Sequence, residues 1–282
     1  MTNIKEASES VLQIDKHLRE NLFLKCGKLK NKKLWENTYI KKQIDKRKNG
    51  GVFTINDHIR GMVYSMLSSG STWNRIEPYI DLATGRIPVI DEIFYQYDVN
   101  ALLNANPAEL NRKVKERKLG TQYLQKQIEA LVKQNIETLL SIQRTHNSID
   151  KFYNSYVNMN DNLITLVKEL STKGNPYKLV QFGEALTAEY LKNVGYDIGK
   201  PDRHIRNILS CNRFSCSAHS VASVDESINI IADIAKYLNK SSAEVDYILW
   251  AYCAKGFGEI CIKNNPKCEI CKVKFCNKKE KL

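Results

Sequence analysis

Apolar side chains recur every three or four residues along most of this chain, which is the spacing of one face of an α-helix. In residues 55–69 one such stripe is made by Ile59, Met62, Val63, Met66 and Leu67. No segment shows sustained alternation of apolar and polar residues, so strands are not expected. The pattern predicts an all-α protein.

The same spacing predicts further helices over residues 7–24, 88–97, 106–118, 121–143, 148–156, 159–173, 184–191, 224–240 and 241–257. Residues beside these stripes supply starts and stops. Asn56 or Asp57 can cap the helix of residues 55–69, and Pro107 suits a first helical turn. Gly195 suits a helix end. The chain is therefore expected to consist of short helices joined by tight turns.

The composition is that of a globular protein. Of 282 residues, 43% are hydrophobic and 26% charged, which is enough chain for one large domain or two small ones. No apolar run approaches the roughly 20 residues that cross a bilayer, and the N-terminal residues lack the apolar stretch of a secretion signal. We therefore expect a cytoplasmic protein without membrane attachment, whose eight cysteines are reduced thiols.

Positive charge is in excess and unevenly placed. The net charge is +12. One basic segment contains Lys25, Lys28, Lys30, Lys32, Lys33, Lys41, Lys42, Lys46, Arg47 and Lys48, and a second contains Lys263, Lys267, Lys272, Lys274, Lys278, Lys279 and Lys281. Such clusters are expected where a protein neutralises the phosphates of a polyanion. The alternative is a solvated, lysine-rich surface.

Four cysteines near the C-terminus, Cys261, Cys268, Cys271 and Cys276, have the spacing C-x6-C-x2-C-x4-C. Soft thiolates this close together suit an iron–sulfur cluster or a zinc ion. The spacing differs from the two evenly separated C-x2-C pairs of zinc ribbons. A zinc knuckle and four unrelated buried cysteines remain alternatives.

Residues 179–209 predict a tight turn between two short helices. The turn falls at Gly183, the second helix runs through Leu191, and Pro201 with Asp202 opens the next helix. Backbone N–H groups at the start of the second helix can hold a DNA phosphate without reading the base sequence. The segment is therefore a candidate for binding to the DNA backbone.

This turn and the aspartate after it resemble the hairpin and catalytic aspartate of the helix-hairpin-helix (HhH-GPD) DNA glycosylase superfamily. Leu179, Phe182, Gly183 and Leu191 match the hairpin, and Asp202 with His204 matches the aspartate step. The cysteine loop that follows resembles the [4Fe–4S] loop of endonuclease III-like members. Its last gap has four residues where that family has five. The resemblance implies that all four cysteines hold a [4Fe–4S] cluster.

Two departures from the family pattern change the expected chemistry. Gln181 replaces the first hairpin glycine, and Ala185 falls where bifunctional members have the lysine that attacks the sugar. Without that amine no Schiff base forms, and strand cleavage is not expected. By resemblance, the catalytic residue is Asp202, whose carboxylate stabilises positive charge on deoxyribose or orients a water. Read alone, Asp202 is an ordinary helix cap.

The resemblance also implies which residues touch DNA. It places Gln181, Gly183, Ala185, Arg203 and Arg206 against the duplex, although the two arginines can equally cover the surface. The stretch of residues 66–77 falls where the family has a glutamine beside the everted base, and Gly70 replaces that glutamine. Ser69, Gly70 and Trp73 are the expected base-pocket residues. Trp73 stacks on the base or belongs to the core.

By this resemblance the fold is all-α, with two helical lobes and a DNA-binding cleft between them. One lobe is residues 56–196, and the other joins residues 1–55 to residues 197–282. The implied function is that of a monomeric, nucleoid-associated DNA glycosylase that everts a damaged or modified base of duplex DNA and hydrolyses its N-glycosidic bond. The alternatives are a DNA-binding protein without catalysis and a glycosylase/lyase that uses a displaced lysine, for which Lys178, Lys192 and Lys200 are nearby in sequence.

Overall fold

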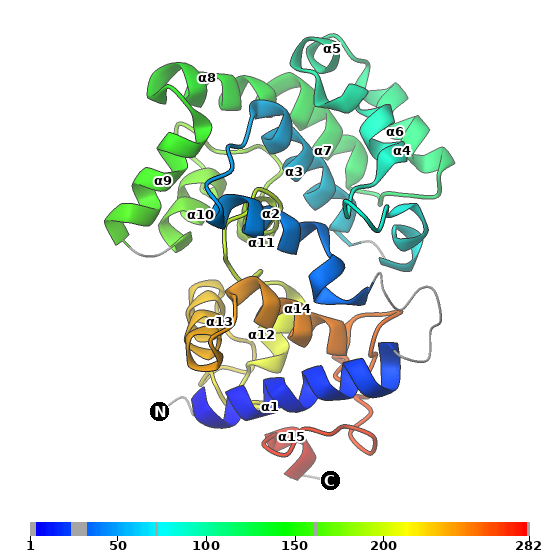
Figure 1. Ribbon diagram of the computed structural model, residues 1–282, viewed down its shortest axis with the longest axis vertical. Helices are drawn as coiled ribbons and strands as arrows, with labels where there is room; N and C mark the ends of the chain where they lie inside the picture. The colour runs from blue at the N-terminus through cyan, green and yellow to red at the C-terminus, as the bar shows by residue number, and fades with distance from the viewer. Residues whose placement is uncertain (1–3, 24–32, 71–72, 161–162, 281–282) are drawn as a thin grey trace. The chain divides into compact units, whose positions relative to one another are not determined.

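The computed structural model describes residues 4–23, 33–70, 73–160 and 163–280, and within these residues every regular element is a helix. The chain forms two compact units. The central unit contains residues 42–196, and the terminal unit combines residues 1–41 with residues 197–282. Figure 1 shows the helices of both units with their labels. The predicted all-α class is confirmed.

The first boundary between the units differs from the sequence prediction. The sequence predicts it after residue 55, whereas the chain passes from the terminal to the central unit between residues 41 and 42. Arg47, in the last turn of α2 (Tyr39–Lys48), accounts for this shift. Its guanidinium donates to the Val194 carbonyl through Nε at 2.9 Å and Nη2 at 2.7 Å, and so ties α2 to the central unit.

Helix α3 (Ile55–Ser68) lies in the core of the central unit, and the predicted apolar stripe is its buried face. It packs against α11 (Glu184–Asn193) and contacts α7 (Leu124–Ala130) and α8 (Ile136–His146). Gly61 allows the close approach, because a Cβ there would lie 2.8 Å from Val194 Cγ1. The other helices of this unit are α4 (Pro88–Ile93), α5 (Val99–Leu103), α6 (Pro107–Glu116), α9 (Ile149–Asn160) and α10 (Leu163–Ser171).

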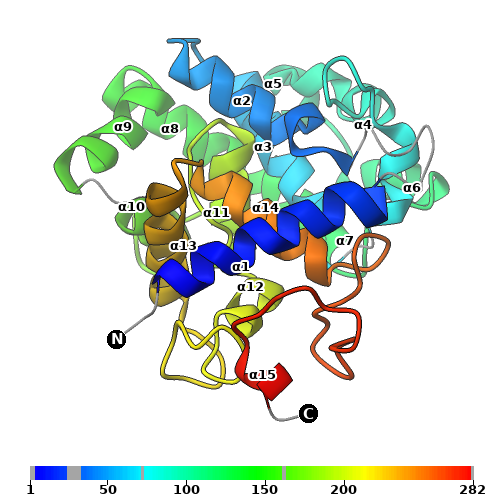
Figure 2. The same ribbon diagram turned by 60° about the horizontal axis from the view of Figure 1, so that its bottom comes forward.

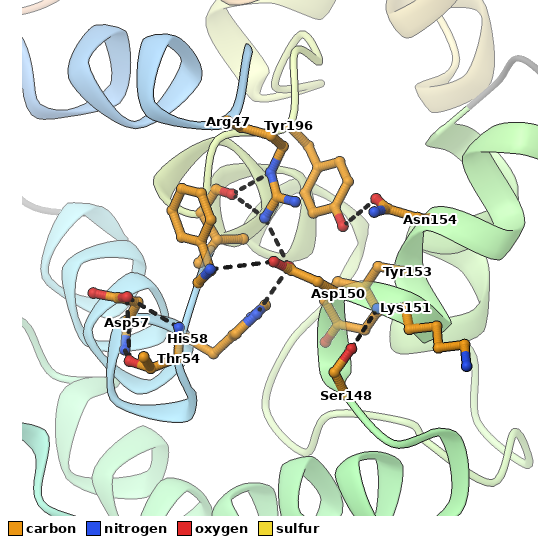
Figure 3. A network of polar contacts seen from close by, with 12 residues as sticks. Arg47, Thr54, Asp57, His58, Ser148, Asp150, Lys151, Tyr153, Asn154 and Tyr196 are labelled. Atoms are coloured by element: carbon orange, nitrogen blue, oxygen red, sulfur yellow. Dashed lines mark hydrogen bonds and ion pairs between the residues drawn. The ribbon is translucent and has the colours of Figure 1, made fainter. Parts of the chain in front are cut away.

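A polar network around Asp150 joins α2, α3 and α9 (Figure 3). The Asp150 carboxylate accepts from Arg47 Nη2 at 2.8 Å and lies 3.3 Å from His58 Nε2. Burial alone would raise the pKa of Asp150, but the hydrogen bonds from His58 and Arg47 hold it at about 2. Burial lowers the pKa of His58, so its ring is neutral, and its Nδ1 lies 2.7 Å from the Tyr190 hydroxyl of α11. The network thereby fixes three helices and the end of α11.

The terminal unit is built from both ends of the chain. Helix α1 (Ile4–His17) packs against α13 (Val224–Leu238) and α14 (Ser242–Cys253), and α12 (Arg203–Ile208) packs against α14. In Figure 2 the C-terminal loop, coloured orange to red, passes α1 before the short α15 (Asn277–Glu280). The Lys274 amide donates to Gln13 Oε1 of α1 at 2.9 Å. One core, which includes Val11 and Ile231, holds these elements together.

Several predicted helix ends are wrong. Thr54, rather than Asn56 or Asp57, caps α3, because its Oγ1 accepts from the Asp57 amide while Asp57 Oδ2 accepts from the Thr54 amide. The helix predicted over residues 121–143 is interrupted by a π-helical turn, Leu131–Asn135. The helix predicted over residues 7–24 continues after α1 as a π-helix, Leu18–Phe23, and residue 24 lies outside the described residues. Gly195 follows α11 with a φ of 84°, as its predicted role as a helix stop requires.

Candidate DNA-binding hairpin, aspartate and cysteine loop

The hairpin turn precedes α11 in the central unit. Gln181 has a φ of 63°, which is the left-handed backbone conformation that glycine adopts most easily. Its side chain is exposed. Gly183 is the N-cap of α11 and has no side chain to cap the helix. The first N–H groups of α11 are therefore directed toward the exposed turn, where an anion can accept from them. Ala185 lies in this first turn, half-buried.

Two side chains without a predicted structural role hold this turn in place. Asn135, fully buried in the π-helical turn, pairs with the Val180 backbone in both directions: Nδ2 donates to the Val180 carbonyl at 3.0 Å, and Oδ1 accepts from the Val180 amide at 2.7 Å. Lys178 Nζ donates to the carbonyls of Leu179 and Phe182, the latter at 2.7 Å. The only sequence signal was the asparagine within an apolar helical stripe, where it is a poor helix former.

Two of the three lysines near the hairpin in sequence are engaged in contacts of the central unit. Burial lowers the pKa of Lys178, but its ammonium is bound to the two carbonyls of the turn. Lys192 is buried in α11 and pairs with Glu189 at 3.0 Å. Both groups are therefore committed to the fold of the central unit. Lys200, the third nearby lysine, belongs to the terminal unit.

Asp202 is the N-cap of α12 in the terminal unit. Its Oδ1 accepts from the His204 amide at 2.8 Å and from the Ile205 amide at 3.1 Å. Both bonds use the same oxygen, and no donor among the described residues reaches Oδ2. The prediction that Asp202 caps a helix is thus correct. Capping leaves the second carboxylate oxygen, Oδ2, available for another contact.

The charged residues after Asp202 have different surroundings. Arg203 is exposed on α12. Arg206, in contrast, donates through Nε to the Ala222 carbonyl at 2.6 Å, and it accepts from the Ala222 amide at 3.0 Å through its own carbonyl. Burial lowers the pKa of His204, which keeps its ring neutral at pH 7. Of the two arginines expected at DNA, Arg203 alone presents an exposed side chain.

The expected base-pocket residues follow α3. Ser69 is half-buried, Gly70 is exposed with a φ of 70°, and Trp73 is half-buried at the start of a short 3₁₀ helix. A Cβ at Gly70 would lie 4.0 Å from Cε2 of Tyr123, an aromatic side chain that is 55% exposed. Thr121 donates to the Ser69 carbonyl at 3.1 Å and so joins the two loops. The sequence did not identify Tyr123, because it lies far from Gly70 along the chain.

The four cysteines of the C-terminal loop line one open cavity together with Arg213, Lys267 and Lys278. Cys268 and Cys276 are buried, and Cys261 and Cys271 are half-buried. Within the described residues, no three His, Cys, Asp or Glu side chains gather closely enough to hold a single metal ion. Thiolates are ligands of both zinc ions and iron–sulfur clusters, so the residue types alone suit either group.

Protein groups also contact the sulfur atoms of this loop. Arg213 Nη1 donates to Cys261 Sγ, and the Tyr252 hydroxyl donates to Cys271 Sγ at 3.5 Å. A hydrogen bond from the buried Cys253 thiol, with the charge and hydrogen bond of Arg213, lowers the pKa of Cys261 to about 7. Burial raises the pKa of Cys268. Donors to sulfur are the usual surroundings of thiolate ligands.

Only some of the cations in the two basic segments are exposed on the surface. Lys25, Lys28, Lys30, Lys32 and Lys281 lie outside the described residues. Lys33 is buried and donates to the Gly256 carbonyl at 2.6 Å, and Arg47 and Lys46 pair with Asp150 and Asp57. These three cations serve the fold, contrary to the expectation of a phosphate-binding cluster. The tail retains exposed lysines, which are Lys263, Lys267, Lys272, Lys274 and Lys278. Among the described residues, no helix combines the length and apolarity that crossing a bilayer requires.

Comparison with known proteins identifies the fold. No family model matches the chain, and no curated protein matches its sequence. Among solved structures, however, its fold is similar to that of the 8-oxoguanine glycosylase/lyase of Methanocaldococcus jannaschii in complex with a 15mer DNA containing 8-oxoguanine, with a TM-score of 0.50 and 19% identity. The match covers 85% of this chain and 95% of that chain, and it supports the predicted all-α fold.

Proposed function

We propose that this protein is a monofunctional DNA glycosylase that hydrolyses the N-glycosidic bond of a damaged or modified base in duplex DNA. The observation that carries the proposal is the order along the chain of an exposed hairpin turn and then an aspartate that caps the next helix, on a fold like that of an 8-oxoguanine glycosylase/lyase. In this proposal the protein acts as a monomer in the cytoplasm, at the nucleoid.

Asp202 is the proposed catalytic residue. Cleavage of the N-glycosidic bond builds positive charge on deoxyribose, and an ionised carboxylate stabilises that charge or orients the attacking water. The cap hydrogen bonds to Oδ1 fix the orientation of the side chain. The oxygen Oδ2 is then the atom that faces the sugar or the water. Neutral His204 serves to orient the start of α12.

The hairpin and Arg203 are the proposed contacts to the DNA backbone. The free N–H groups at the start of α11 bind a phosphate, and Arg203 supplies a second, charge-assisted contact. These contacts hold the duplex without reading its sequence. Base specificity then depends on the pocket, for which Ser69, Gly70 and Trp73 are the proposed lining residues.

Tyr123 is the proposed substitute for the glutamine that Gly70 replaces. An everted base leaves a gap in the stack, and a flat side chain fills it at the cost of little conformational entropy. Tyr123 is exposed and aromatic, and its ring lies within van der Waals reach of a Cβ at Gly70. The hydrogen bond between Thr121 and Ser69 holds the two loops together.

Cys261, Cys268, Cys271 and Cys276 are the proposed ligands of a [4Fe–4S] cluster. Such a cluster supplies a rigid, electron-transfer-competent centre around which the loop is ordered. The exposed tail lysines then lie on an ordered loop and add phosphate contacts. Purified protein should be brown, with absorption near ~400 nm and four iron atoms for each chain. Colourless protein that contains one zinc ion would contradict this assignment.

A glycosylase/lyase with a displaced lysine is the first alternative. The engagement of Lys178 and Lys192 within the central unit argues against it. Borohydride reduction during turnover on lesion-bearing duplex tests this directly. Absence of a covalent protein–DNA adduct is expected, and a trapped adduct that is lost in Lys178→Gln or Lys200→Gln would establish a lyase.

A DNA-binding protein without catalysis is the second alternative. Incubation with a panel of lesion-bearing duplexes separates it from an enzyme. The first duplex should contain 8-oxoguanine, the lesion in the structurally similar complex, followed by alkylated bases, mismatched adenine and oxidised pyrimidines. Free base and alkali-labile sites indicate the glycosylase, whereas a gel shift without base release indicates the binding protein.

A further inference from the structure

Arg213 lies in the segment of residues 211–216, whose two cysteines had no assigned role. It is 8% exposed, and all four of its terminal N–H groups have acceptors in the cysteine loop. Nη1 donates to the carbonyl of Cys261 at 2.7 Å and to its Sγ, and Nη2 donates to the carbonyls of Ile262 at 2.7 Å and Lys263 at 3.2 Å. A single side chain therefore binds three consecutive residues at the first cysteine of the loop.

The charge of Arg213 requires polar partners, since an isolated buried charge costs several kcal/mol. No carboxylate among the described residues forms an ion pair with Arg213. Three carbonyl oxygens and one sulfur of the cysteine loop take that place, so the position of the guanidinium and the path of the loop are fixed together.

Neighbouring contacts hold Arg213 itself in place. The Asn277 amide donates to the Arg213 carbonyl at 2.8 Å, and Asn277 Nδ2 donates to the Cys211 carbonyl at 2.8 Å. The Phe214 amide donates to the Ile208 carbonyl of α12 at 3.1 Å. The segment of residues 211–216 thus connects the helix that Asp202 caps to the cysteine loop.

We propose that Arg213 is a positioning residue that fixes Cys261 and the two residues after it, and so orders the loop for its cluster. The inference rests on the proposed cluster and not on glycosylase activity. Removal of a positive charge and a hydrogen bond from a ligand sulfur makes a cluster harder to reduce and easier to lose. Lysine keeps the charge, but it lacks the planar fork that reaches several acceptors.

The test compares the holoprotein with Arg213→Met, Arg213→Lys and a control, Lys255→Met, which removes an exposed cation of the same unit. We expect Arg213→Met to lose iron to a chelator at least about tenfold faster than wild type, with a more negative midpoint potential. Arg213→Lys should fall between the two, and Lys255→Met should match wild type. If Arg213→Met does not fold, the comparison of Arg213→Lys with wild type carries the test.

Wild-type potential and iron retention in Arg213→Met, or in a folded Arg213→Lys when the former is lost, would overturn the inference. Colourless wild-type protein would also overturn it, together with the proposed cluster. Base release by the wild type is measured in parallel. Wild type that holds iron but releases no base contradicts the glycosylase proposal and leaves the Arg213 result to be judged on its own.

Discussion

Replacement of Asn135 by alanine should lower the stability of the central unit and weaken its proposed binding to DNA. Asn135→Ala removes the two hydrogen bonds that join α7 and α8 to the Val180 backbone, at 3.0 and 2.7 Å. Each such bond contributes about 1 kcal/mol net, and an orphaned backbone group costs about 1 kcal/mol or more. The free energy of unfolding should fall by about 2–4 kcal/mol, a large part of the stability of a domain.

The loss should extend to DNA binding because Val180 lies within the hairpin turn. If the turn relaxes, the N–H groups at the start of α11 no longer meet a phosphate. A lost charge-assisted contact costs about 1.5 kcal/mol, or roughly a tenfold rise in Kd. The slope of log K against log salt should become shallower by about 1, and equally for all base sequences.

The assays are urea denaturation and fluorescence anisotropy with labelled duplex over a range of KCl concentrations. Asn111→Ala is the matched control, because Asn111 is a buried asparagine of the same unit whose Oδ1 accepts no hydrogen bond from the described residues. Asn111→Ala should bind DNA with the wild-type salt slope. Folded Asn135→Ala with wild-type affinity and slope would refute the assignment of the hairpin as a phosphate contact.

Three further predictions concern other parts of the molecule. The pKa of Asp150 is lowered from 3.8 to about 2, so this group contributes about 2 kcal/mol to the free energy of unfolding at neutral pH, which is lost as the pH falls from about 5 to 2. Asp150→Asn should flatten the dependence of the unfolding free energy on pH in this range. An unchanged dependence would contradict the role of the network. Tyr123→Ala should slow base release roughly tenfold, whereas Tyr123→Phe should not. The rates are measured in single turnovers, with 2-aminopurine fluorescence as the readout of base eversion. Equal rates in both variants would remove Tyr123 from the proposal. Cys268→Ser should yield colourless, poorly folded protein, checked by visible absorption and circular dichroism, and a brown, stable variant would exclude Cys268 as a ligand.

The parts of the fold that were predicted correctly depend on residues close together in sequence. The stripe from Ile59 to Leu67 identified the buried face of α3, and Gly195 identified the end of α11. The hairpin was located from a few residues, and its left-handed turn survives the replacement of glycine by Gln181. These features follow from helical periodicity and local backbone preference, which a single sequence displays directly.

The parts that were missed depend on contacts between distant residues. Asn135 binds Val180 from 45 residues away, and Arg213 binds Cys261 from 48 residues away. Helical periodicity says nothing about such pairs, because it describes only neighbours along one helix. The same limit applies to the lysine-rich segment, where Lys33 and Arg47 counted as surface charge until their buried partners were known.

The most direct test of the proposed function is mass spectrometry of the bases that are released from a pool of duplexes with mixed lesions. Wild type and Asp202→Asn are compared at equal, saturating DNA concentrations. Asparagine can still cap α12, so the variant should fold and bind the duplex. We predict that wild type releases a modified base and that Asp202→Asn binds with similar affinity but releases none. Equal release by both proteins would contradict the role of Asp202, and release by neither would contradict the glycosylase.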